Sequence, residues 1–147
     1  MLARGLSLSK KPTMTVVAAA LADAEGRILL QQRPPGGPMA GLWEFPGGKV
    51  EEGEVPEHAL ARELEEELGI AVHVEALEAA CFASAPLGDR HLILLLYLCS
   101  DWAGDPQPLH ATALRWTRPS EMRSLPMPPA DLPLIDLLER LIVQRPD

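Results

Sequence analysis

The segment from Pro56 to Gly69, "PEHALARELEEELG", constrains the fold more than any other part of the chain. It begins with a proline, which suits a first helical turn because no N–H bond is needed there, and it ends with a glycine, which suits a helix stop. Leu60, Leu64 and Leu68 recur every four residues and form an apolar stripe. The sequence therefore predicts a helix from Pro56 to Leu68 that packs on a core through these leucines.

The same helix carries a high density of like charge. Eight glutamates lie within residues 51–67. Glu63, Glu66 and Glu67 are spaced i, i+3, i+4, so they share one face, where like charges destabilise a helix by a few tenths of a kcal/mol per pair. A hard divalent cation would turn that cost into a binding site, because Mg²⁺ prefers carboxylate oxygens. A solvated acidic face is the alternative interpretation.

Strand-like segments surround this helix and a second one near the end of the chain. The sequence predicts strands in six segments: 14–23, 27–33, 42–45, 71–84, 90–100 and 113–117. The first two are predicted to form a hairpin, and 85–89 is predicted as a turn. The remaining segments are a Pro- and Gly-rich loop, a helical turn and a segment that ends in a helix: 34–41, 119–125 and 127–143. This last helix is predicted to be capped by Asp131 or to begin near it, with Pro133 early in it. We expect an α+β fold, with residues 1–13 as an N-terminal tail and 14–147 as a single domain.

The net charge of −8 argues against a nucleic-acid polymer as partner, because such partners require a basic surface. A small phosphorylated substrate is compatible with this charge if metal cations mediate the contact. No apolar run approaches the roughly 20 residues that cross a bilayer, so we expect no membrane partner. Two cysteines without a CxxC pair are too few for a disulfide framework or a zinc site, and they fit a reducing cytoplasm.

From Gly48 onward the residues follow the pattern G-x5-E-x7-R-E-U-x-E-E-x-G-U, where U is aliphatic. All nine fixed positions are filled: Gly48, Glu54, Arg62, Glu63, Leu64, Glu66, Glu67, Gly69 and Ile70. The pattern resembles the Nudix box of the Nudix hydrolases, which cleave a nucleoside diphosphate linked to another moiety, usually with Mg²⁺ or Mn²⁺. "LLQQRPPGGPMAGLWEFPGGKVEEGE" and "MPPADLPLI" resemble the MutT branch, best known for hydrolysing 8-oxo-dGTP. The resemblance implies a Nudix-type α-β-α sandwich with a mixed β-sheet and two main helices.

The resemblance implies a set of catalytic residues: Glu54, Arg62, Glu63, Glu66 and Glu67. The last three glutamates would ligate the metal, joined by the backbone carbonyl of Gly47. Glu63 would also orient or deprotonate the attacking water, and Arg62 would pair with Glu54 to steady the loop before the helix. This assignment fits the chemistry, because hydrolysis of a phosphoanhydride needs phosphate charge neutralised and a water made more nucleophilic.

The resemblance also implies a set of substrate-binding residues: Arg33, Glu44, Phe45, Lys49 and Asp131. The arginine would contact phosphate, with a plain surface charge as the alternative. Phe45 would give main-chain contacts to the purine, and Met39 and Leu134 would line the same pocket.

Two positions distinguish this chain within the branch. MutT carries an asparagine at Asp131, whereas pyrimidine-directed relatives carry an aspartate. An ionised carboxylate only accepts hydrogen bonds, so Asp131 can accept from a purine N1–H and 2-amino group or from the amine of cytosine. Capping the last helix is the alternative role. At His110 MutT has a glutamate ligand; either another carboxylate, with Asp105 nearest in sequence, replaces it here, or the site has one ligand fewer.

The sequence thus predicts a Mg²⁺-dependent enzyme, with Mn²⁺ as a substitute. It would hydrolyse oxidised purine nucleoside triphosphates such as 8-oxo-dGTP to the monophosphate and pyrophosphate, and so sanitise the nucleotide pool. The alternatives are a cytosine nucleotide (CTP or 5-methyl-dCTP), an ADP-ribose type of substrate, or a nucleotide-binding module without catalysis. The sequence leaves open whether the chain is a monomer or a homodimer.

Overall fold

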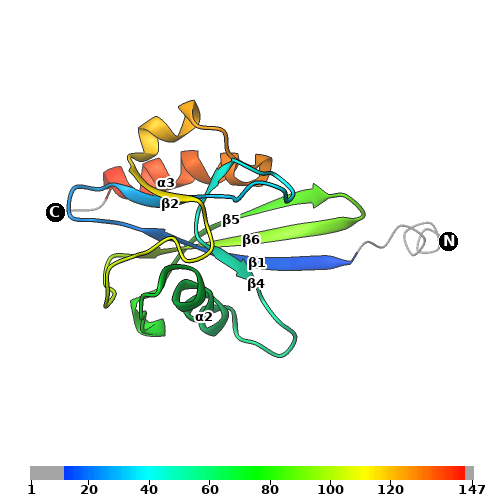
Figure 1. Ribbon diagram of the computed structural model, residues 1–147, viewed down its shortest axis with the longest axis horizontal. Helices are drawn as coiled ribbons and strands as arrows, with labels where there is room; N and C mark the ends of the chain where they lie inside the picture. The colour runs from blue at the N-terminus through cyan, green and yellow to red at the C-terminus, as the bar shows by residue number, and fades with distance from the viewer. Residues whose placement is uncertain (1–11, 145–147) are drawn as a thin grey trace.

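The computed structural model describes residues 12–144 and consists of strands between two main helices (Figure 1). The elements, with η marking a 3-10 helix, are β1 (Thr13–Leu21), β2 (Ile28–Gln32), β3 (Trp43–Glu44), β4 (Gly47–Lys49), α2 (Pro56–Leu68), η1 (Val74–Ala76), β5 (Glu78–Leu87), β6 (Arg90–Cys99), β7 (Ala113–Thr117), η2 (Pro119–Ser124), η3 (Pro129–Asp131) and α3 (Leu132–Gln144). Residues 1–11 of the predicted tail lie outside the described residues, whereas Pro12 and Thr13 lie inside them, and β1 already begins at Thr13.

The strands form two sheets. The larger sheet has the order β4-β1-β6-β5, and the smaller one has the order β3-β2-β7. β1 and β6 run parallel, from Thr13 opposite His91 to Leu21 opposite Cys99, whereas β4 and β5 lie antiparallel at the two edges. The predicted mixed sheet is therefore confirmed, and a small antiparallel sheet accompanies it.

The predicted hairpin between the first two strands is wrong. β1 and β2 share only the bridge between Ala22 and Ile28 and then enter different sheets. The turn between them is local and well held, because the Asp23 carboxylate accepts the backbone N–H of Arg27 at 2.8 Å. The pairing is not local, because the end of β1 is buried on both faces and therefore takes a central place in the larger sheet.

Two other predictions about the strands differ from the structure. The strand predicted at 71–84 starts with η1, and β5 continues to Leu87, so the turn predicted at 85–89 shrinks to Gly88 and Asp89. The last helix, predicted to be capped by Asp131 or to begin near it, begins at Leu132 as α3, directly after the short helix η3. β4 was not predicted, since a Pro-Gly-Gly run gives no strand signal.

Two apolar cores separate the layers. Leu60, Leu64 and Leu68 of α2 are fully buried on one side, and α3 packs its own apolar face on the other side. On β2, Leu29 packs toward α2 and Leu30 toward α3, because successive side chains of a strand point to opposite faces. The predicted α-β-α sandwich and the predicted helix from Pro56 to Leu68 are confirmed (Figure 1). Of the helices in residues 12–144, none is both long and apolar enough to cross a membrane.

Candidate active site

The two glycines of β4 bring backbone unusually close to its neighbours. A Cβ added to Gly47 would lie 2.0 Å from the carbonyl oxygen of Val17 on β1. A Cβ added to Gly48 would lie 2.5 Å from the carboxyl carbon of Glu63 on α2. Because both positions lack a side chain, β4 fits between β1 and the acidic face of α2.

Arg62 joins the acidic face of α2 to the loop before it. Its Nε and Nη2 bind the two carboxylate oxygens of Glu54 at 2.7 and 2.9 Å. This bidentate pair holds the pKa of Glu54 down to about 2. The arginine Nη1 also contacts Glu63 at 2.9 Å and the exposed Glu66 at 3.5 Å. The predicted pairing of Glu54 with Arg62 is present.

Glu67 lies deeper in the structure than the other acidic residues of α2. Its Oε2 accepts a hydrogen bond from the Gln31 side-chain amide at 2.8 Å, and its Oε1 accepts one from the Gly47 backbone N–H at 3.2 Å. Burial raises the pKa of Glu67 to about 7, with a further contribution from the Glu63 carboxylate, although both hydrogen bonds act in the opposite direction. Burial likewise raises the pKa of Glu63.

Sequence reasoning missed Gln31. The side chain is 2% exposed and follows Ile28, Leu29 and Leu30 on β2, where its only sequence signal is a polar residue at a position facing α2. A single amide in a strand forms no motif, so no sequence pattern connects Gln31 with a glutamate 36 residues later.

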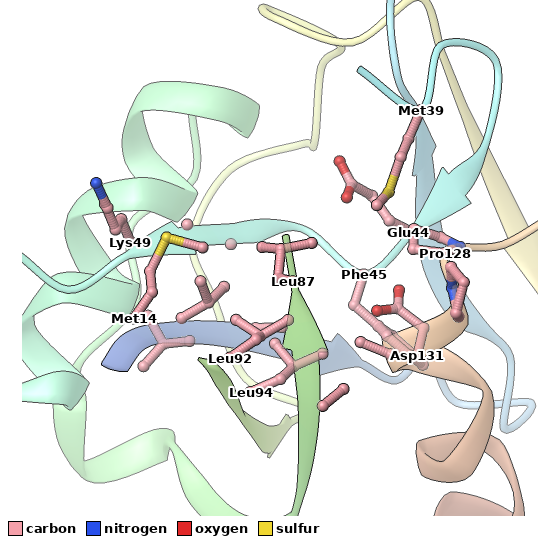
Figure 2. A pocket seen from close by; sticks show the side chains of 18 of the residues that line it. Met14, Met39, Glu44, Phe45, Lys49, Leu87, Leu92, Leu94, Pro128 and Asp131 are labelled. Atoms are coloured by element: carbon pink, nitrogen blue, oxygen red, sulfur yellow. The ribbon is translucent and has the colours of Figure 1, made fainter. Parts of the chain in front are cut away.

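Two hollows meet at this place. The first is a polar cleft lined by Arg33, Pro34, Gly37, Pro38, Glu44, Gly47, Gly48, Lys49, Glu63, Glu67 and His110. The second is a mostly apolar pocket of about 330 Å³, shown in Figure 2. They share five lining residues: Arg33, Glu44, Gly47, Gly48 and Lys49. The polar cleft therefore continues into the apolar pocket along β4 and the end of β2.

Leu87, Leu92 and Leu94 line the middle of the apolar pocket, and Phe45 and Asp131 lie together at one end (Figure 2). Asp131 is only 6% exposed, and burial raises its pKa to about 7, with Glu44 adding to the effect and a hydrogen bond with the Phe45 backbone opposing it.

Most of the predicted substrate-binding residues line one or both hollows. Arg33 contacts Glu44 at 2.9 Å, and burial raises the pKa of that glutamate although the arginine opposes the shift. Met39 lines the apolar pocket as predicted, but Leu134 does not: in the described chain it is fully buried in the core beneath α3. On α3, Leu134 belongs to the same buried cluster as Ile135 and Leu138, so its side chain faces the core and not the pocket.

The donor set of the polar cleft fits a hard cation. Glu63 and Glu67 both line it, and carboxylate oxygens are the ligands that Mg²⁺ prefers. In residues 12–144 no three acidic, histidine or cysteine side chains converge as a ready metal site. Glu63 and Glu66 instead contact Arg62. His110 lines the polar cleft. Asp105 is among the residues that the structure describes, but it lines neither the polar cleft nor the apolar pocket.

Comparison with known proteins identifies the family of this chain. The NUDIX domain family matches residues 11–138. The CTP pyrophosphohydrolase of Escherichia coli is 41% identical over 90% of this chain and 97% of its own length, and the 8-oxo-dGTP diphosphatase of the same organism is 33% identical over 87% and 98%. The solution structure of the E. coli ORF135 protein superposes with a TM-score of 0.81 at 39% identity, covering 92% of this chain and 95% of that one. The chain belongs to the Nudix hydrolase family and resembles its MutT-like pyrophosphohydrolases.

Proposed function

We propose that this chain hydrolyses nucleoside triphosphates to the monophosphate and pyrophosphate with Mg²⁺, and that an oxidised purine nucleotide such as 8-oxo-dGTP is its substrate. The observation that carries the proposal is the continuity of the two hollows. A polar cleft with Glu63 and Glu67 opens into an apolar pocket that ends at a buried carboxyl group, Asp131. A triphosphate chain fits the first hollow and a nucleobase the second.

Different residues at the polar cleft would bind the cation, contact the phosphates and position the attacking water. Glu63 and Glu67, which line the cleft, and Glu66, which lies outside its lining on the same helix, would hold the cation with the Gly47 carbonyl. When bound, the cation would neutralise phosphate charge and activate water. Arg33 and Lys49 line both hollows, so their positive charges face the place where a triphosphate would pass between them. Glu63 lies against the backbone of Gly48, which fixes the carboxylate that would position the attacking water.

Asp131 would read the base through its protonation state. An ionised carboxylate accepts two hydrogen bonds, which suits the N1–H and 2-amino group of a guanine-type base. A protonated carboxyl donates one bond and accepts one, which suits N3 and the 4-amino group of cytosine. Because burial brings the pKa of Asp131 to about 7, both states are accessible near neutral pH.

A cytosine nucleotide such as CTP is the second candidate substrate. It is favoured by the CTP pyrophosphohydrolase that is 41% identical to this chain, and by the aspartate at position 131.

The catalytic assignment is tested by pyrophosphate release, measured after conversion to phosphate. We expect Glu63→Gln and Glu67→Gln to lower kcat by at least about 100-fold, because each removes a charge from the cleft. Glu65→Gln is the matched control, since Glu65 is exposed on the same helix. Near wild-type turnover in both variants would refute the metal assignment.

The base assignment is tested by the ratio of kcat/KM for 8-oxo-dGTP to that for CTP, followed between about pH 5.5 and 8.5. We expect the ratio to rise with pH, because ionisation of Asp131 favours the guanine edge. Titration of Glu67 affects both substrates and cancels in the ratio. Asp131→Asn should make the ratio independent of pH, because an amide donates and accepts throughout this range. A ratio that rises equally in wild type and variant would exclude Asp131 as the reader.

A further inference from the structure

Gln31 occupies an interior position of the smaller sheet. It lies on the central strand β2, opposite Glu44 of β3 and opposite Leu114 of β7, and it is 2% exposed. Cross-strand neighbours point to the same face of a sheet, so Gln31 and Glu44 face α2 together. Neighbouring strands on both sides therefore hold Gln31 in place even when no ligand is bound.

The Gln31 amide makes one long-range contact, with Glu67 on α2. Its Nε2 donates to Glu67 Oε2 at 2.8 Å, while the backbone N–H of Gly47 donates to Glu67 Oε1 at 3.2 Å. Each carboxylate oxygen thus has one donor from a different strand, one from β2 and one from β4. Two donors at fixed places hold the plane of a carboxylate and leave its other lone pairs to point elsewhere.

The other atom of the same amide has no such role. Across the described chain Gln31 Oε1 is buried and lacks a hydrogen-bond partner. A buried acceptor without a partner destabilises the folded state. Leucine, the residue at the two preceding positions, would avoid this cost. What the amide contributes to the molecule is therefore the N–H that it gives to Glu67.

We propose that Gln31 is a positioning residue for the metal site: it orients the Glu67 carboxylate so that its free lone pairs face the polar cleft. The inference rests on the proposed function, in which Glu67 holds the cation. Outer hydrogen-bond partners of metal ligands are typically worth about 10- to 100-fold in metal affinity. Gln31 itself does not line the cleft in the described chain, so it acts through Glu67 alone.

The test is Mn²⁺ binding without nucleotide, followed by the EPR signal of the free ion. Gln31→Met and Gln31→Leu replace the amide with an apolar side chain of similar size and so remove the donor. We expect both to bind Mn²⁺ about 10-fold or more weakly. The Mg²⁺ concentration for half-maximal hydrolysis should rise with it, while KM for the nucleotide at saturating Mg²⁺ stays unchanged.

Gln32→Met is the matched control. Gln32 is the next residue of β2, and its Nε2 donates to the Gly41 carbonyl at 3.2 Å instead of to the site. We expect this variant to bind Mn²⁺ like the wild type. Equal Mn²⁺ affinity in the wild type, Gln31→Met and Gln31→Leu would overturn the inference.

A measurement on the wild type covers the case in which these variants do not fold. In an NMR titration with Mg²⁺, the side-chain amide of Gln31 should shift, whereas that of Gln32 should not. An unshifted Gln31 amide at saturating Mg²⁺ overturns the inference.

Glu67→Gln separates this inference from the proposed function. If Glu67→Gln binds Mn²⁺ as the wild type does, the metal assignment fails and the role of Gln31 fails with it. If Glu67→Gln loses Mn²⁺ but the Gln31 variants do not, only the role of Gln31 is wrong.

Discussion

Two carboxyl groups of this site have the same raised pKa for different purposes. Burial brings both Glu67 and Asp131 to a pKa of about 7. Glu67 has two hydrogen-bond donors and lies in the polar cleft, where a cation would restore its charge. Asp131 lies at the end of an apolar pocket, where a base edge would decide between its charged and neutral forms. At the scale of single residues, the same burial would therefore support metal binding in one hollow and base reading in the other.

Asp131→Asn should change the pH dependence of folding stability. The folded pKa of Asp131 is raised from the ordinary value of 3.8 to about 7, so the folded state binds the proton more tightly than the unfolded state. Wild-type stability from this group is complete below about pH 4 and is lost as the pH rises toward 7. Asparagine does not titrate. The variant should match the wild type at low pH and exceed it by on the order of 4 kcal/mol at pH 8, since each pKa unit corresponds to about 1.4 kcal/mol.

Urea unfolding of the metal-free protein at several pH values measures this difference. Asp136→Asn is the control, because Asp136 is exposed on α3 and contacts Arg123 at the surface. A stability difference between Asp131→Asn and the wild type that does not grow with pH would contradict the expected titration.

The helices and strands differ in how well their own sequences predict their bounds and partners. α2 could be predicted with its start and stop, because Pro56, the leucine stripe and Gly69 are local signals, and Gly69 does adopt the left-handed conformation with φ 71°. The pairing of β1 could not be predicted, because the turn at Asp23 is equally compatible with a hairpin and with a following strand that joins another sheet. The glutamates that we propose as metal ligands could be identified from their spacing, whereas the role of Gln31 depends on which strand lies under α2.

Substitution of the two glycines of β4 should separate folding from catalysis. In Gly48→Ala the new methyl group meets the flexible end of the Glu63 side chain, which can move aside. We expect a folded protein with kcat reduced at least about 10-fold, because the displaced carboxylate no longer positions water. In Gly47→Ala the methyl group meets the Val17 carbonyl on β1, and backbone cannot move aside so easily. We expect loss of stability of about 1–3 kcal/mol or more.

Thermal unfolding of both variants, with kcat at a temperature below both transitions, distinguishes these effects. Gly53→Ala gives a reference for loop strain without a clash, because its Cβ would meet no atom within 4 Å. A Gly48→Ala enzyme with full activity would show that the approach of Glu63 to β4 is unimportant for turnover.

The whole molecule assembles the site from both sheets and both sides of the sandwich. The larger sheet supplies Gly47, Gly48 and the floor of the apolar pocket; the smaller sheet supplies Gln31 and Glu44; α2 supplies the acidic face; and η3 supplies Asp131. A ligand that binds these parts together must stabilise the folded state as a whole.

Mg²⁺ should raise the Tm of the wild type, and EDTA should reverse this. The shift should be larger at pH 8 than at pH 6, because Mg²⁺ requires ionised Glu67 and its pKa is about 7. Glu67→Gln should show little shift at either pH, whereas Glu65→Gln should behave like the wild type. Differential scanning calorimetry at constant ionic strength makes the measurement. An equal shift in Glu67→Gln would show that the cation acts elsewhere on this acidic protein.

The parallel pairing of β1 with β6 has a consequence for biosynthesis. β1 leaves the ribosome first, but its partner follows only after β2, β3, β4, α2 and β5 have been made. At a synthesis rate of roughly 5–20 residues per second, β1 remains without its partner for several seconds before β6 can pair with it. Pairs so distant in sequence also form slowly once both strands are present. A nascent chain stalled before Arg90 would be inactive. It would also expose the unpaired edge of β1, and such an edge promotes aggregation and binding by chaperones.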